Sequence, residues 1–190
     1  MNTLDDIRAK LAAIPDPDTT PGLSPAQARE LDRQRRLWDG VLANVTNLVP
    51  MLAERDAQIA EQESWRDLLL AFRKETADVI VKLLAEKAAL TDRHEQRRID
   101  ERLLALTASI RAVDRGVEYA GPYAMLPTPL NEWLLAHGVT PKPGQTNVWN
   151  GRGSIAQTQQ RLQELRDKRN ELQARIDAAL STVDKHAVTV

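Results

Sequence analysis

The chain has 190 residues, of which 26 are Lys or Arg and 27 are Asp or Glu, so its formal net charge is −1. This balance disfavours a globally basic nucleic-acid-binding protein and an acidic disordered tail. Cys is absent and only 4 % of residues are aromatic, which excludes disulfides and thiolate metal sites and favours an all-α fold over a β-barrel or sandwich.

Residues 1–23 are predicted to form a short helix, to about Ala13, and a Pro-rich linker from Ile14 to Gly22. Asp5 and Asp6 lie in the first turn of this helix, where the helix dipole favours acidic side chains. The segment lacks the apolar core of a secretory signal peptide. We expect it either to be mobile or to dock on a neighbouring subunit.

Residues 24–116 are predicted to be a helical bundle segment. Ser24, Pro25 and Gln27 have the types that begin a helix with a capping box. Pro50 interrupts the helical pattern that follows, and whether it kinks or breaks the helix is left open. The longest charge-free run is Gly40 to Ala53, which is shorter than the roughly 20 apolar residues of a membrane span.

Two apolar stripes run along residues 64–90, which indicates a helix with neighbours on more than one side. The first stripe contains Trp65, Leu69, Phe72, Val79, Leu83 and Leu90, and the second contains Leu68, Ile80 and Leu84.

Two further helices, at about 91–115 and 154–184, carry apolar residues in alternating steps of three and four, which is coiled-coil spacing. We expect them to pair as an antiparallel hairpin. The second seam contains Leu165, Leu172 and Ile176, and Arg169 is its charged position. A polar seam residue lowers stability but sets register or partner choice. Residues 154–190 are therefore predicted to be a C-terminal heptad helix.

Residues 117–153 form a segment of low charge, called here the knob, at the predicted tip of that hairpin. It holds 5 of the 8 Gly and 5 of the 10 Pro. One short helix is expected inside it, with Thr128 as its cap and Gly138 after its end. Tyr and Trp in a stretch of low charge are typical of interface cores. The candidate partner-binding residues are Tyr119, Tyr123, Met125, Trp133 and Trp149. Alternatively, the two Trp fold back and cap the bundle as a small core.

Gly151, Arg152, Gly153 and Ser154 match the start of a phosphate-binding glycine loop that opens a helix. The charged heptad helix that follows argues against a dinucleotide fold, so we interpret the motif as a turn with an N-cap and, at most, a weak anion site. The alternative is an enzyme or ligand binder whose site lies between the knob and Ser154, and His137 would then be a further candidate residue. We expect no catalytic residue, metal or cofactor, because no constellation in the sequence has the required spacing.

The sequence therefore predicts an all-α, elongated helical bundle that is a non-enzymatic structural or interaction protein. Its expected partners are proteins, copies of itself included, in a homo-oligomer or a multi-subunit complex, and neither nucleic acid nor membrane is expected. A phage or virus particle component or assembly factor is the most natural role. Helical tip or filament subunits of bacterial secretion systems are a second, since they commonly carry an irregular region on a coiled-coil hairpin. An inhibitor or adaptor that binds through the knob is a third. We expect a cytoplasmic location, with packaging into a particle or signal-free export left open.

Overall fold

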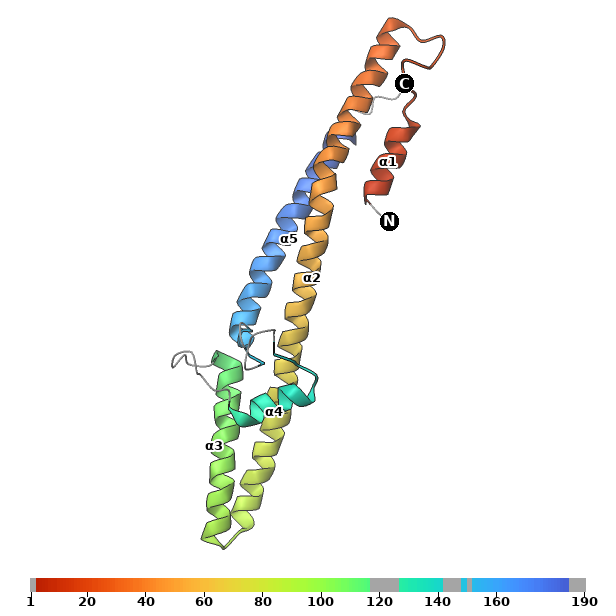
Figure 1. The fold of residues 1–190 in the computed structure, drawn as a ribbon. Coiled ribbons are helices and arrows are strands. Elements are labelled where there is room, and N and C mark those ends of the chain that lie inside the picture. The colour runs from red at the N-terminus through yellow and green to blue at the C-terminus, as the bar shows by residue number, and fades with distance from the viewer. Residues whose placement is uncertain (1–2, 117–126, 142–147, 150–151, 185–190) are drawn as a thin grey trace. The chain divides into compact units, whose positions relative to one another are not determined.

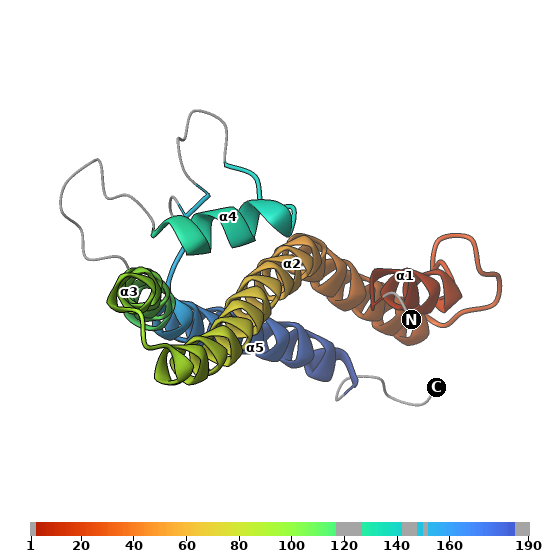
Figure 2. The ribbon, with the colours of Figure 1, turned by 90° about the horizontal axis from the view of Figure 1, so that it is seen from below.

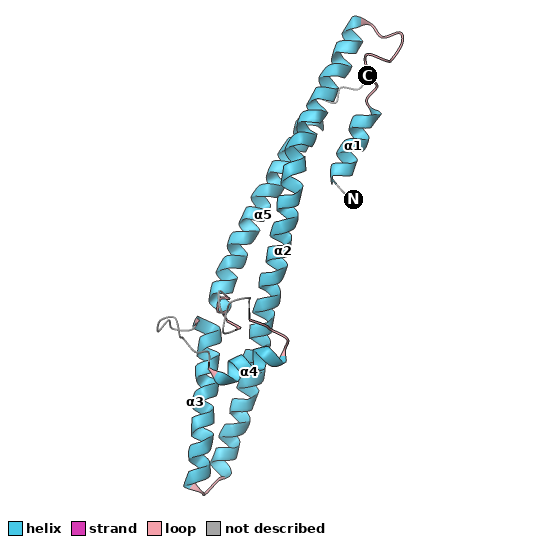
Figure 3. Cartoon of the chain, viewed as in Figure 1, coloured by secondary structure: helices cyan, strands magenta, loops and turns pink. Residues whose placement is uncertain are grey.

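A computed structural model describes residues 3–116, 127–141, 148–149 and 152–184. Five α-helices and the loops between them make up these residues, with no strand among them (Figures 1 and 3). The all-α fold class is confirmed. The helices are α1 (Thr3–Ala13), α2 (Pro25–Ala89), α3 (Arg93–Arg115), α4 (Thr128–Ala136) and α5 (Ile155–Asp184).

Pro50 does not break the helical pattern. It lies inside α2, which continues for 65 residues, and its ring is exposed to solvent. A proline at this position removes one backbone hydrogen bond from the helix. The apolar residues on both sides of it, Val45, Leu48 and Leu52, are buried or half-buried. Tertiary packing on both sides therefore holds the helix together across the missing bond.

The chain divides into two compact units, and the divisions fall within α2 and α5. Unit 1 comprises residues 1–59 and 165–190, and unit 2 comprises residues 60–164. Each long helix thus contributes its two parts to two different hydrophobic cores.

The core of unit 1 is built from α1, the first part of α2 and the last part of α5. Ile7 of α1 is 2 % exposed, so this helix docks on its own chain. The Lys10 ammonium lies 5.2 Å from the centre of the Trp38 ring, which strengthens the docking. The buried residues are Ile7, Trp38, Val41, Val45, Leu48, Leu172 and Ile176.

The core of unit 2 lies among the last part of α2, α3, α4 and the first turn of α5. Figure 2 shows α4 on one side of the pair formed by α2 and α3. Leu130 and Leu134 of α4 are fully buried in this core. The buried cluster consists of Trp65, Leu69, Phe72, Ala112, Val113, Leu130, Leu134, Val148 and Ile155.

The expected hairpin between residues 91–115 and 154–184 is not confirmed, because these clusters place both seams on α2. The seam of α3 packs on α2, where Ile99 and Leu106 form a cluster with Leu83. The seam of α5 also packs on α2, through Leu172 and Ile176. Because a heptad seam specifies a helical partner but not which one, the spacing alone could not distinguish α2 from the other seam.

Two helix starts also differ from prediction by one or two residues. The short helix of the knob begins at Thr128 itself, with Pro127 at the N-cap position. Helix α3 begins at Arg93, where the Asp92 side chain accepts a hydrogen bond from the backbone N–H of His94. Both differences lie at helix ends, where several neighbouring residues can serve as the cap.

Candidate functional site

Trp65 anchors the start of α5 to α2 within unit 2. Its indole Nε1–H donates a hydrogen bond to the backbone carbonyl of Gly153, at 2.9 Å. The Trp149 ring meets it edge-on, with centroids 5.7 Å apart. The Arg152 guanidinium carbon lies 5.0 Å from the centre of the Trp65 ring. Trp149 is therefore packed as part of a small core, which is the alternative that the sequence had left beside a role in partner binding.

Trp133 of α4 makes a similar set of contacts with α2. Its Nε1–H donates to the Glu75 carboxylate at 2.8 Å, and its ring meets Phe72 edge-on at 5.4 Å. The His137 ring stacks on the Trp133 ring, with centroids 3.7 Å apart. Trp133 is half-buried and His137 is exposed. The two Trp of the knob thus pack against the core at α2, and both are half-buried.

Three of the candidate partner-binding residues, Tyr119, Tyr123 and Met125, lie outside the described residues. Gly151 of the anion-site candidate does as well. The prediction that the knob contacts a partner through these aromatic side chains therefore stays a prediction.

The helix start at Ser154 uses its own side chains as caps. The Ser154 N–H donates to the Gln157 side-chain carbonyl at 3.0 Å, and the Gln157 N–H donates to the Ser154 hydroxyl at 3.3 Å. This reciprocal pair is a capping box. The Arg152 guanidinium lies over Trp65, and the Arg152 backbone N–H donates to the Trp149 carbonyl at 2.7 Å. The weak anion site stays a prediction.

The charged seam residue Arg169 lies in unit 1 and pairs with α2. Its Nε donates to the Asp56 carboxylate at 3.1 Å, and both side chains are partly exposed. Leu172 and Ile176 are buried beside it and Leu165 is half-buried. Arg169 therefore contacts a helix of its own chain, and its role in register or partner choice stays a prediction.

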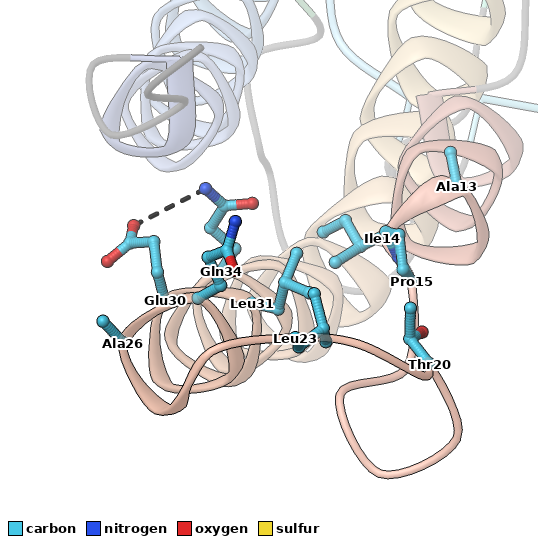
Figure 4. A pocket seen from close by; sticks show the side chains of 10 residues that line it. Ala13, Ile14, Pro15, Thr20, Leu23, Ala26, Glu30, Leu31 and Gln34 are labelled. Atoms are coloured by element: carbon cyan, nitrogen blue, oxygen red, sulfur yellow. Dashed lines mark hydrogen bonds between the residues drawn. The ribbon is translucent and has the colours of Figure 1, made fainter. Parts of the chain in front are cut away.

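A pocket of about 610 Å³ lies in unit 1, between the end of α1, the linker and the start of α2 (Figure 4). Its walls are mainly apolar, with Ile14 and Pro15 on one side and Leu23 and Leu31 on another. Glu30 supplies the one charged group in the lining, and it accepts a long hydrogen bond, 3.5 Å, from Gln34. This lining holds no pair of acid and base side chains of the kind that catalysis requires.

A stripe of exposed apolar side chains in unit 2 runs along α2 and faces away from the core. We call it the 70–88 face, and it contains Leu70, Ala77, Val81, Leu84 and Ala88, all of which are exposed. Leu70 is 39 %, Val81 66 % and Leu84 51 % exposed. The sequence predicts Leu84 in a second stripe with Leu68 and Ile80, but those two side chains are half-buried against the core.

The signal that finds the 70–88 face is its spacing. Successive members are separated by seven, four, three and four residues, which keeps them on one side of a helix. The buried residues Leu69, Phe72 and Leu83 lie on another side of the same helix. The breadth of the apolar pattern predicts neighbours on more than one side of this helix. Both α3 and α4 pack on it, whereas the residues of the 70–88 face are exposed.

Two kinds of feature are absent from the described residues. No group of three or more His, Asp or Glu side chains there lies close enough together to hold a metal ion. Among the same residues, none of the helices is both long and apolar enough to cross a membrane. Comparisons with protein families, curated proteins and solved structures give no match for this chain.

Proposed function

We propose that this chain is a non-enzymatic structural protein that serves as a helical subunit of a larger protein assembly. The observation that carries the proposal is the 70–88 face, which exposes large apolar side chains at heptad spacing on a helix whose opposite side is buried. Apolar surface of this kind marks protein–protein contacts when its members are contiguous along a helix.

The packing inside each unit adds to this argument. Each unit has its own buried cluster, and Leu69, Leu130 and Leu134 are fully buried. The core of unit 2 is therefore complete without the 70–88 face. Leaving Val81 and Leu84 in water costs about 25 cal/mol for each Å² of apolar surface, and contact with another protein would recover that free energy.

A phage or virus particle component or assembly factor is the form of assembly that we favour. Long helices with few loops and separate small cores suit proteins that contribute helical surfaces to a particle. A tip, filament or accessory subunit of a bacterial secretion system is the alternative. Both roles are compatible with a protein that is made in the cytoplasm before assembly.

The experiment that tests the proposed function is the absolute mass in solution, measured by size-exclusion chromatography with light scattering. The wild-type chain is examined over about a hundredfold range of concentration, because association shifts with protomer concentration. We expect a multiple of 21.3 kDa that persists on dilution or declines along a binding curve. A mass of one chain at every concentration would contradict self-assembly.

A further inference from the structure

We infer that the 70–88 face pairs with the same face of a second copy of this chain, as a parallel two-stranded coiled coil in register. This inference rests on the proposed function and names the partner. The residue types on the face, the charges beside it and one lysine within it support this pairing.

The residue types on the face match one kind of coiled coil. In heptad notation, Leu70, Ala77 and Leu84 occupy d positions, and Val81 and Ala88 occupy a positions. A β-branched residue at a, combined with Leu at d, favours two parallel strands. The small side chains of Ala77 and Ala88 allow the two helices to approach closely at those layers. These features select a two-stranded pairing of like helices.

The charges beside the face select the parallel orientation. Arg73 occupies a g position on one side of the a and d seam, and Asp78 occupies an e position on the other side. In a parallel dimer in register, g of one helix lies beside e of the next heptad of its partner, so Arg73 would meet the second copy's Asp78 twice by symmetry. The antiparallel arrangement that matches the same layers would instead place the two Asp78 side chains opposite each other.

Both flanking residues are accessible for this contact. Half of the Arg73 side chain is exposed, and its Nε lies 3.5 Å from Asp114 of α3. Asp78 is exposed on the other side of the face. Arg73 can therefore reach a second carboxylate while it keeps its long contact with Asp114, because a guanidinium has five N–H donors.

Lys74 is the one charged residue within the stripe. It is exposed and occupies the a position between Leu70 and Ala77. A parallel pairing would bring the two Lys74 side chains side by side. A single lysine at an a position lowers stability while it specifies register and the number of strands. The Lys74→Leu variant should therefore bind its own copy at least about tenfold more tightly.

The orientation is tested by cross-linking single cysteines, which is straightforward because the chain contains no Cys. Val81→Cys places one thiol on the face, and the parallel pairing brings it next to its symmetry mate. Leu104→Cys on α3 is the matched control, since Leu104 is 73 % exposed but lies off the face. Under mild oxidation, we expect Val81→Cys to form a disulfide-linked dimer at least about tenfold faster than Leu104→Cys.

Two results of this experiment would overturn the inference. One is equal cross-linking rates for the two variants. The other is a cross-link that forms between Ala77→Cys and Val81→Cys chains when they are mixed, but not between two Val81→Cys chains, because that pattern is antiparallel.

Two substitutions distinguish a failure of this inference from a failure of the proposed function. Leu84→Asp should weaken self-association by at least about tenfold, while Leu104→Asp should leave it unchanged, and circular dichroism checks that both variants stay helical. If the wild type forms oligomers that Leu84→Asp leaves intact, the inference is wrong and the proposed function stands. If the wild type is monomeric at every concentration, the inference is wrong, and the proposed assembly must then form with a different protein.

Discussion

Gly153 has no side chain, and several other residues contact its backbone. Its carbonyl accepts hydrogen bonds from the Trp65 indole at 2.9 Å and from the Thr158 hydroxyl at 3.4 Å. A Cβ atom at this position would lie 2.9 Å from the Cβ of Gln157, which is closer than two such carbon atoms pack. The glycine therefore lets the chain that enters α5 pass close to the Gln157 side chain in the first turn of that helix.

At the residue scale, Gly153→Ala is expected to lower the free energy of unfolding by about 1–3 kcal/mol, as overpacking does. Gly40→Ala is the matched control. Gly40 is exposed inside α2 and has no neighbouring atom within 4 Å of an added Cβ. That substitution should raise stability by about 0.5–1 kcal/mol, because alanine favours a helix over glycine. Chemical denaturation measures both, and effects of the same sign would contradict the argument.

At the scale of the element, α2 contains prolines with opposite consequences. Pro25 is its first residue, where the missing N–H costs nothing. Pro50 is in its interior, where a proline removes a backbone hydrogen bond and crowds the preceding turn. Packing on both sides of Pro50 keeps the helix continuous, but the lost hydrogen bond and the crowding still lower the stability of the folded state.

Pro50→Ala is therefore expected to raise the free energy of unfolding by about 1–3 kcal/mol. Because Pro50 also restricts the unfolded chain, its loss reduces this increase. Thermal unfolding followed by circular dichroism measures the change. Pro25→Ala serves as the control and should leave the midpoint unchanged or lower it slightly. An unchanged midpoint for Pro50→Ala would show that α2 has already relaxed around the proline.

At the scale of the whole molecule, contacts distant in sequence attach the N-terminal helix. Ile7 is buried against α2 and α5 residues in the core of unit 1. Ile7→Ala should lower stability by about 2–4 kcal/mol and release α1. Limited proteolysis should then cut faster within the linker at residues 14–22.

Leu104→Ala is the control for this prediction, since that side chain is 73 % exposed and its truncation should cost less than about 0.5 kcal/mol. Equal proteolysis of the wild type and Ile7→Ala would show that α1 does not depend on this contact for its attachment.

The elements that the sequence predicted correctly depend on neighbours in the chain. The capping box of Ser24 and Gln27 forms as its spacing indicates, with hydrogen bonds of 3.0 and 3.3 Å. Gly138, expected after the short helix of the knob, has a φ of +77° that favours glycine. Such features were readable because the atoms involved lie within three or four residues of each other.

The candidate sites were harder to predict because their partners are distant in the chain. Nothing near Trp65 in sequence indicates that its indole meets Gly153, 88 residues away. Nothing near Trp133 in sequence indicates that its indole donates a hydrogen bond to Glu75. The aromatic residues of the knob were identified as a group, but whether each one packs inward or faces a partner depends on α2.

The sequence alone determined that this protein is built of helices, where several of them begin and end, and which of their sides are apolar. Local hydrogen bonding and periodicity decide these properties. Tertiary structure alone decided that α3 and α5 both pack on α2, that α1 docks on its own chain, and that the 70–88 face stays exposed. The physical reason is that a heptad seam favours burial against a helix but does not specify which helix. Packing in three dimensions selects among the apolar partners.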